Sequence, residues 1–582
     1  MCGIFTLLNN DNHIQQSIIE SCFSNGKGRG PEFSSLSHCA IKAQLGFHRL
    51  AINGLNPEAN QPIQIQNISL ICNGEIYNYL ELYKTLNVSP TTDSDCEVII
   101  HMYLKYGMEQ TLRMLDGVFA FVLIDTRFNE PSKIYIARDP YGVRPLYQMK
   151  PISQLKSSKN HVYGFASEIK GLYDIYDYIK GTNCDYRTLD PNCASKYPDY
   201  CIEQFQPGTF SCYELPYGTK KSWKFVSSQQ YHYHGFHSNM YTDYLNTNTI
   251  FSNIRKHLIN AVHKRCSATD RPIACLLSGG LDSSLITAIV NGYHKQHNLP
   301  VLETYSIGIE GADDLKHAKI VADYLGTKHT EIVLSESEFI NAIPEVIKGI
   351  ESYDTTTVRA SIGNWLLGKY ISEHSDAKVI FNGDGSDELS GGYLYMGSAS
   401  DEIEFDKECR RLLKDIHTFD VLRSDKSISS HGLEPRTPFL DREWTEYYLS
   451  IPAHVRFHTN EKLPEKYLIR KAFSKEEYAM YDDEPLLPDS VIWRRKEAFS
   501  DGVSTQSRSL YQIIQEHVAK IVGLYSEFVS FTHLPPQTPE QIYYRTIFEE
   551  NYAGLGHIIP YFWMPKYVDA TDSSARTLSI YK

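Results

Sequence analysis

Short apolar runs alternate with longer amphipathic segments over the second half of the chain. Runs of strand length fall at residues 273–277, 302–309, 330–334 and 377–381. After the first run, a Gly/Ser-rich loop leads into an apolar helix that extends to Ile289. Residues 313–325 predict a second helix, because five apolar residues share one face: Leu315, Ala318, Val321, Ala322 and Leu325. Strands and helices alternating at this spacing predict a parallel α/β sheet covered on both faces, with ligands at the carboxyl ends of its strands.

The N-terminal part has a different pattern, of short strands separated by turns. Residues 117–125 and 133–137 are rich in Val, Ile, Tyr and Phe and predict strands. The run 69–72 ends at Asn73-Gly74, a dipeptide typical of tight turns. Residues 150–244 are rich in Ser, Tyr, His, Lys and Pro, so we expect irregular surface structure there, with an inter-domain linker at 216–245.

The length and net charge of the chain limit its number of domains and the kinds of partner it can bind. A chain of 582 residues is too long to fold around one hydrophobic core, because single cores stop growing at roughly 250–300 residues. The change of pattern predicts two domains, at residues 1–215 and 246–582. A net charge of −13 disfavours nucleic acid or an anionic membrane as main partner. No apolar run approaches the about 20 residues of a membrane helix, and no signal peptide is recognisable, so we expect a cytosolic protein.

Four of the twelve cysteines lie close together along the chain: Cys184, Cys193, Cys201 and Cys212. Their spacing is not Cys-x-x-Cys, so a structural zinc site is the weaker alternative to incidental thiols in a loop-rich connector. In a reducing cytosol we expect the cysteines to be free.

One cysteine occupies a special position, because the chain begins Met1-Cys2. If Met1 is removed, Cys2 carries both a thiol and a free α-amine, with ordinary pKa values near 8.5 and about 7.7–8.0. The amine is then a built-in general base for the thiol nucleophile. A cysteine at this position is weak evidence alone, but Arg49, the turn dipeptide Asn73-Gly74 and the carboxylate of Asp95 follow it.

Together these residues resemble the class II glutamine amidotransferases. The resemblance implies an N-terminal-nucleophile αββα sandwich in which Cys2 attacks glutamine, Arg49 binds its α-carboxylate and Asp95 holds its α-ammonium. Asn73 and Gly74 would form the oxyanion hole, a role that suits amide donors, as a guanidinium suits a carboxylate. The implied glutamine-binding residues are Arg49, Leu50, Ala51, Ile52, Asn53, Asn73, Gly74, Glu75 and Asp95.

The match has one departure in this domain. The family has His-Arg-Gly-Pro-Asp where residues 28–32 read Gly-Arg-Gly-Pro-Glu, which places the detail of that loop in question. His48 also invites a catalytic role, but the amine of Cys2 makes another base unnecessary, so we assign His48 to the structure.

A second motif, residues 278–284, reads Ser-Gly-Gly-Leu-Asp-Ser-Ser between a predicted strand and a predicted helix. Its glycines let the backbone approach phosphate, and the helix N-terminus presents free N–H groups to an anion. No Gly-Lys-Ser/Thr follows, so it is not a Walker A loop. It resembles the PP-loop of ATP pyrophosphatases, which cleave ATP between the α- and β-phosphates. Asp282 is a candidate Mg²⁺ ligand.

An acidic loop, residues 382–388, follows the fourth predicted strand of this half. Asp387 is a natural second ligand for Mg²⁺. Farther along, Lys496 lies in Arg-Arg-Lys-Glu-Ala-Phe and is suited to neutralise the charge on departing pyrophosphate. Asp384 stands where the family pattern has a glutamate thought to assist the synthetase chemistry.

Both motifs in one chain resemble the glutamine-hydrolysing asparagine synthetases over nearly the whole sequence, including residues 353–361, 431–441, 563–566 and the animal-like 573–578. The resemblance implies hydrolysis of glutamine and amidation of aspartate through β-aspartyl-AMP, with ATP and Mg²⁺ and as a homodimer. It implies Cys2, Asn73, Gly74, Asp384 and Lys496 as catalytic residues, and Asp282 and Asp387 as metal ligands. The implied ATP-binding residues are Leu276, Ser278, Gly279, Gly280, Asp282, Ser283, Ile307, Asn382 and Gly383.

Three alternatives stay open. A β-lactam synthetase shares both domains but has no use for the intact Cys2, Arg49 and Asp95. A phosphoribosyl amidotransferase shares only the first domain and lacks a PP-loop. A catalytically impaired or regulatory homologue is compatible with the departure at Asp384.

Overall fold

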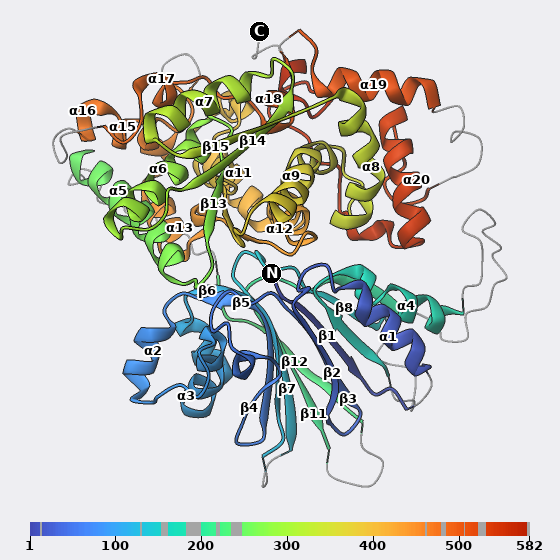
Figure 1. Cartoon of the computed structure of the whole chain (residues 1–582). Helices are drawn as coiled ribbons and strands as arrows, with labels where there is room; N and C mark the ends of the chain where they lie inside the picture. The colour runs from blue at the N-terminus through green and yellow to red at the C-terminus, as the bar shows by residue number, and fades with distance from the viewer. Residues whose placement is uncertain are drawn as a thin grey trace.

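The computed structural model describes residues 1–11, 14–127, 131–152, 161–181, 200–216, 222–233, 247–459, 463–478, 485–505, 507–521 and 531–578. The chain forms two stacked parts (Figure 1). The N-terminal part contains antiparallel sheets, and the C-terminal part is built on one parallel sheet. Met1 lies at the junction between the two parts (Figure 1). The predicted two-domain α/β and α+β fold class is confirmed.

Two six-stranded sheets form the N-terminal part. The first has the order β10 (Tyr200–Gln204), β8 (Tyr147–Pro151), β9 (Tyr163–Ala166), β1 (Gly3–Leu8), β3 (Ala43–Arg49), β2 (Phe33–Ala40). The second has the order β12 (Lys224–Gln230), β11 (Thr209–Leu215), β7 (Ser132–Arg138), β6 (Gly117–Asp125), β5 (Ile68–Ile76), β4 (Ile63–Ile65). Helices α1 (Gln16–Asn25) and α4 (Tyr173–Lys180) cover the first sheet, and α2 (Tyr79–Leu86) and α3 (Val98–Met114) cover the second (Figure 1).

Strand β6 shows why the layers form. Ala120, Val122 and Ile124 pack against the other sheet, whereas Phe119 and Phe121, with Leu123, pack under α2 and α3. A strand buried on both faces has a continuous apolar sequence, which is why the sequence predicts its bounds correctly.

Two expectations for this part are wrong. Asn73-Gly74 is not a turn but lies inside β5, opposite Ala120 and Phe119 of β6. Residues 150–244 are not irregular throughout, because β9, α4, β10, β11 and β12 lie there. Their polar composition reflects exposed strand faces: β12, an edge strand, is exposed at most of its positions. The proposed linker at 216–245 thus includes a strand of the N-terminal sheet, while the domain limits themselves stay a prediction.

The C-terminal sheet is entirely parallel, as predicted, with the order β15 (Lys328–Leu334), β14 (Glu303–Ile309), β13 (Ile273–Leu276), β16 (Val379–Phe381), β17 (Glu434–Arg436). Helices α5 (Thr247–Ser267), α6 (Leu281–Gln296) and α7 (Asp313–Leu325) pack on one face, and α8 (Glu336–Ile350) and α9 (Thr355–His374) pack on the other. The four predicted strands and the helix 313–325 are confirmed. Strand β17 was missed because it is short and contains two charged residues and a proline.

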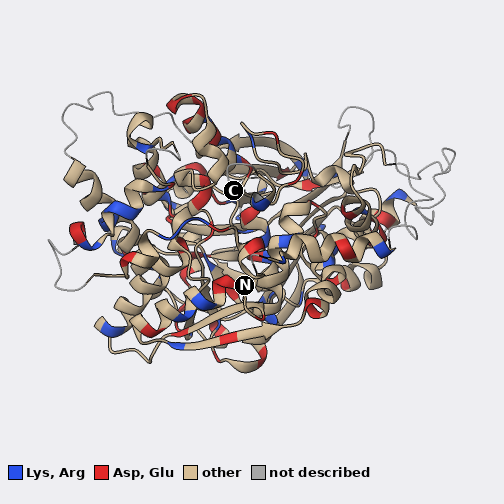
Figure 2. Cartoon of the chain, turned by 90° about the horizontal axis from the view of Figure 1, so that it is seen from above, with Lys and Arg blue, Asp and Glu red and all other residues tan. Residues whose placement is uncertain are grey.

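The remaining helices surround the carboxyl ends of these strands or extend the domain. They are α10 (Ser386–Ser390), α11 (Glu402–Asp415), α12 (Asp420–Ser429), α13 (Arg442–Ser450), α14 (Ala453–Arg456), α15 (Tyr467–Ala472), α16 (Lys475–Tyr478), α17 (Asp489–Ile492), α18 (Phe499–Gly502), α19 (Leu510–Ile521) and α20 (Pro539–Tyr552). Among the described residues, none of the helices has the length and apolarity that a bilayer crossing requires. Figure 2 shows basic and acidic residues intermixed along the ribbon when the molecule is seen from above.

Candidate active sites

The N-terminal residues lie deep in the junction between the two parts. The thiol of Cys2 donates to the carbonyl oxygen of Leu50 at 3.5 Å. The Met1 α-amine donates to the carbonyl oxygen of Leu433, in the C-terminal part, at 3.1 Å. Burial lowers the pKa of the Met1 amine to about 5 and raises the pKa of the Cys2 thiol to about 11. While Met1 is present the thiol is therefore protonated at neutral pH and needs a base.

Arg49 lies at the end of β3. Among the residues that the structure describes, every hydrogen-bond acceptor of its positively charged guanidinium is neutral. Its guanidinium donates to the main-chain oxygen of Asn56 and the side-chain oxygen of Asn60, each at 2.8 Å. It also contacts the main-chain oxygens of Asn53 and Gly54. These acceptors hold the guanidinium in place without neutralising its charge, an arrangement that suits the binding of a carboxylate. Leu50, Ala51 and Ile52 follow it and are buried.

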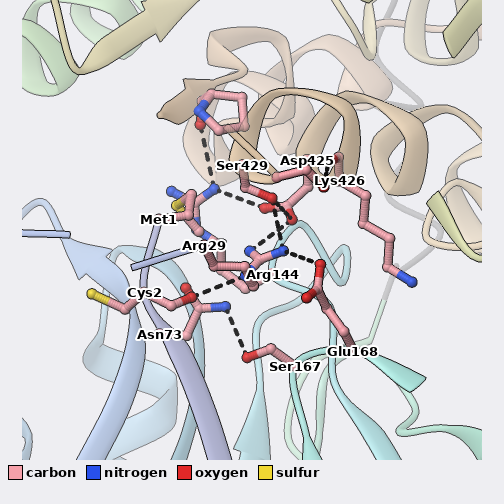
Figure 3. A network of polar contacts seen from close by, with 12 residues as sticks. Met1, Cys2, Arg29, Asn73, Arg144, Ser167, Glu168, Asp425, Lys426 and Ser429 are labelled. Carbon is pink, nitrogen blue, oxygen red and sulfur yellow. Dashed lines mark hydrogen bonds and ion pairs between the residues drawn. The ribbon is translucent and has the colours of Figure 1, made fainter. Parts of the chain in front are cut away.

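Asn73 and Gly74 occupy adjacent positions of β5. The Asn73 amide donates to the hydroxyl of Ser167 at 3.4 Å (Figure 3). That hydroxyl also accepts the N–H of Ile4 at 3.0 Å. A Cβ at Gly74 would lie 2.3 Å from the carbonyl oxygen of Val118. Only glycine therefore fits at this point of the strand, which explains a turn-favouring dipeptide inside a sheet.

Two buried carboxylates accompany these amides. Asp95 accepts the N–H of Ile76 at 2.6 Å, and Glu75 accepts the side-chain amide of Asn53 at 2.5 Å. Burial raises the pKa of Asp95 to about 6. Burial, reinforced by the charge of Asp95, raises the pKa of Glu75 well above its usual range. Glu434 of β17 acts electrostatically on both, as well as on Cys2 and Met1.

Arg29 links Cys2 to the C-terminal part, a role that the sequence did not reveal. Its Nε donates to the main-chain oxygen of Cys2 at 3.0 Å. One terminal nitrogen donates to Ser429 at 2.8 Å, and the other lies 2.7 Å from Asp425 (Figure 3). Arg144 lies 3.4 Å from the other oxygen of Asp425. All of these side chains are buried, so the main chain at Cys2 is fixed directly to helix α12.

The departure at Glu32 has a structural consequence. One carboxylate oxygen accepts the N–H of Ala51 at 2.7 Å, and the other lies 2.8 Å from Arg271. Arg271 in turn donates to the carbonyl oxygen of Ala51 at 2.8 Å. The stretch after Arg49 is thus tied to the segment that leads into β13. The ring of His48 stacks on Phe23, and the assignment of His48 to the structure stays a prediction.

The loop at 278–284 joins β13 to helix α6, as predicted. Gly279 has a φ of +71°, and a Cβ there would lie 2.4 Å from the main-chain nitrogen of Ala318. The Ser283 hydroxyl accepts the N–H of Ser278 at 3.2 Å. No side chain caps the helix at Gly280, so the first N–H groups of α6 remain available to an anion.

Four charged side chains converge beside this loop. Lys466 Nζ lies 2.6 Å from Asp282 and 2.5 Å from Asp387. Lys496 Nζ lies 2.6 Å from the other oxygen of Asp387 and 3.8 Å from Asp282. Although burial opposes it, these two ammonium groups hold the pKa of Asp387 well below its usual range. Asp387 is therefore ionised at any working pH.

Lys466 was not among the predicted residues. It lies just before α15 in a stretch with no recognisable motif, and its side chain is 1% exposed. No local pattern distinguishes it from a surface lysine, so only the fold brings it to the loop.

The acidic loop after β16 lies against the first. A Cβ at Gly383 would lie 2.8 Å from both Asp282 Cβ and Ser283 N, so the two loops touch. Asn382 Oδ1 accepts the N–H of Asp384 at 3.3 Å. One oxygen of Asp384 lies 3.3 Å from Arg423 of α12, and the other is buried without a hydrogen-bond partner among the described residues.

These loops enclose a cavity of about 170 Å³. Its lining includes the predicted Leu276, Ser278, Gly280, Asp282, Ser283, Ile307, Asn382, Gly383, Asp384, Asp387 and Lys496, and not Gly279. It also includes residues that the sequence did not indicate: Tyr393, Asp420, Arg423, Lys466 and Glu497.

The four-cysteine cluster cannot be followed in full, since Cys184 and Cys193 lie outside the described residues. Cys201 is in β10 and Cys212 is buried in β11. Over the described ranges, no group of three or more His, Cys, Asp and Glu residues has the geometry to hold a metal ion by itself.

Known proteins match both parts of the chain. The glutamine amidotransferase domain model matches residues 1–213, and the asparagine synthase model matches residues 253–403 and 398–557. Glutamine-hydrolysing asparagine synthetases of Gallus gallus and Homo sapiens are 39% and 38% identical to this chain, and each alignment covers 100% of this chain and 99% of the relative. A solved NMN synthetase from Francisella tularensis is 12% identical and covers 50% of this chain and 99% of its own, with a TM-score of 0.21 that is too low to bear on the fold.

Proposed function

The chain belongs to the glutamine-hydrolysing asparagine synthetases, and from that premise we propose which of its residues carry each half of the reaction. Glutamine is hydrolysed at the junction site around Cys2. Aspartate is activated with ATP in the cavity between the loops after β13 and β16, and ammonia from the first site displaces AMP to give asparagine.

In the first half, removal of Met1 leaves the α-amine of Cys2 to take the thiol proton. Arg49 receives the α-carboxylate of glutamine, since its neutral partners leave its charge uncompensated. Ionised Asp95 receives the α-ammonium. The thiolate attacks the side-chain amide, and the Asn73 amide with the N–H of Gly74 stabilises the oxyanion. Ammonia leaves, and water then releases glutamate from the thioester.

In the second half, the free N–H groups at the start of α6 hold the phosphates of ATP. Leu276 and Ile307 line the same cavity and are assigned to the nucleotide. The β-carboxylate of aspartate attacks the α-phosphate, and the bond to the β-phosphate breaks. Lys466 and Lys496 stabilise the charge that develops on the departing pyrophosphate.

The residues present fit Mg²⁺, although the described ranges hold no complete protein cage. Mg²⁺ is usually held by one or two carboxylates together with substrate phosphates. Asp282 and Asp387 supply such a pair, bridged by Lys466. When bound there, Mg²⁺ would neutralise phosphate charge; the two lysines would then turn from the carboxylates to phosphate oxygens.

Asp384 is proposed to act in forming the adenylate and in its attack by ammonia. Its unpartnered oxygen is buried beside the cavity, while its other oxygen is held by Arg423. We propose that the loop compensates for the shorter side chain, so the enzyme is active.

Cytosolic placement is consistent with the ten described cysteines, all of which are free. A homodimer is proposed from the family resemblance alone.

The observation that carries the synthetase assignment is the meeting of Asp282, Asp387, Lys466 and Lys496 beside an uncapped helix N-terminus. The test is to identify the ATP products formed with aspartate and ammonium. We expect AMP and pyrophosphate, and Asp282→Asn should suppress both while glutamine hydrolysis persists. ADP as main product would exclude the PP-loop assignment.

A further inference from the structure

The segment that carries Lys496 has no regular secondary structure of its own. Residues 494–498 form an irregular stretch between α17 and α18. Side-chain contacts therefore fix its position. On one side, Arg494 lies 3.0 Å from Asp314 of α7 and donates to the main-chain oxygen of Ser278 at 3.3 Å.

On the other side, the contacts come from the C-terminal tail, residues 572–578. The Arg576 guanidinium directs two N–H groups at one carboxylate oxygen of Glu497, at 2.9 and 2.7 Å. Its third contact is the main-chain oxygen of Thr505, at 2.7 Å. Both Arg576 and Glu497 are only 12% exposed. The tail thus contacts the segment at Glu497, the residue next to Lys496, and contacts Thr505 beyond α18.

The tail is itself anchored. Asp572 lies 2.6 Å from Arg359 of α9, which Glu540 also contacts. The Ser574 hydroxyl donates to Asp501 of α18 at 3.0 Å, and Leu578 is buried against an aromatic cluster. Arg576 therefore projects from a fixed backbone rather than from a fraying end.

We propose that Arg576 is a positioning residue for the synthetase reaction, acting on Lys496 through Glu497. The role rests on the proposed function of Lys496 at the departing pyrophosphate. Glu497 lines the nucleotide cavity, where a released carboxylate would repel the phosphates and compete for the neighbouring ammonium. Arg576 both neutralises Glu497 and holds its carboxylate in place, which leaves Lys496 to Asp387 and the phosphates.

The test uses the full-length enzyme with ammonium as nitrogen source, so that the glutaminase is bypassed. Arg576→Ala should lower kcat for pyrophosphate release about tenfold, less than the roughly 100-fold that a misplacement on the order of 1 Å costs. Arg576→Lys should recover part of the loss. Glutamine hydrolysis should stay at the parent rate. If Arg576→Ala does not fold, Arg576→Gln replaces it.

The matched control is Arg508→Ala, which removes a guanidinium paired with Glu336 and Glu516 on the surface of the same region; its kcat should stay within about twofold. A double-mutant cycle adds a readout that general destabilisation would not give. In a Glu497→Gln background, Arg576→Ala should lower kcat little further, because the side chain that Arg576 neutralises no longer carries a charge.

Parent-like kcat and KM for ATP in Arg576→Ala, or losses that simply multiply in the double variant, would overturn the inference. Lys496→Ala, assayed alongside, separates the two proposals. If Lys496→Ala is inactive while Arg576→Ala is normal, only the role of Arg576 is wrong. If Lys496→Ala is fully active, the proposed role of Lys496 is wrong as well.

Discussion

Lys466 Nζ lies 2.6 Å from Oδ2 of Asp282, although 184 residues separate them in the chain. The contact joins the loop between β13 and α6 to the stretch just before α15. A buried ammonium is costly to leave unpaired, and the carboxylates of Asp282 and Asp387 satisfy this one. In the proposed reaction, phosphate oxygens of ATP take the place of these carboxylates.

Lys466→Ala should therefore reduce synthesis of asparagine by about 100-fold or more, since a preorganised charge at the departing group is lost. Glutamine hydrolysis should be unaffected, because Lys466 belongs to the other site. The measurement is pyrophosphate release with ammonium, and the control is Lys471→Ala, which breaks a surface pair with Glu476. A loss in Lys471→Ala equal to that in Lys466→Ala would show that the effect is not local.

Cys2→Ala should abolish glutamate formation and glutamine-dependent synthesis while leaving ammonium-dependent synthesis intact. Mass spectrometry of the parent should find Cys2 as the first residue, since a retained Met1 leaves the thiol protonated. Normal glutamate release from Cys2→Ala would mean that another nucleophile operates.

Asp384→Ala should eliminate asparagine formation and leave glutamine hydrolysis unchanged. Asp384→Glu restores the family residue and should keep activity within about tenfold of the parent if the loop has adapted to the shorter side chain. Asparagine and pyrophosphate are measured together for each variant. Parent-like synthesis by Asp384→Ala would remove Asp384 from the mechanism.

Binding of glutamine should weaken in acid. Burial raises the pKa of Asp95 to about 6, so the carboxylate proposed to hold the α-ammonium is ionised above pH 6 and protonated below it. The Kd of glutamine for the Cys2→Ala protein, measured by calorimetry, should rise about tenfold from pH 7 to pH 5. Asp95→Asn should bind weakly at both pH values. A Kd of the Cys2→Ala protein that is equal at pH 7 and pH 5 would speak against this assignment.

Helices and strands with a regular pattern of apolar residues were predictable from the sequence. Helix α7 and strand β6 have the predicted bounds, because one has a single apolar face and the other is apolar on both. Asn73-Gly74 was misassigned since local turn preference was overridden by the close approach of Gly74 to Val118 in the neighbouring strand.

The site was predictable where a motif is local and not where the fold assembles it. Cys2, the loop at Asp282 and the loop at Asp387 have short signatures. Lys466 and Glu434 do not, because each acquires its surroundings from segments distant in the chain. Arg576 likewise gains its partner Glu497 only through the packing of the tail.

The central claim, that one chain transfers nitrogen from glutamine to an adenylated aspartate, is tested most directly with glutamine labelled with ¹⁵N at the side-chain amide. The purified chain is incubated with this glutamine, aspartate, ATP and Mg²⁺, and the products are quantified together. The account predicts ¹⁵N in the side-chain amide of asparagine, with AMP and pyrophosphate in equal amounts to asparagine. Glutamate and labelled ammonia without labelled asparagine, or ADP in place of AMP, would contradict it.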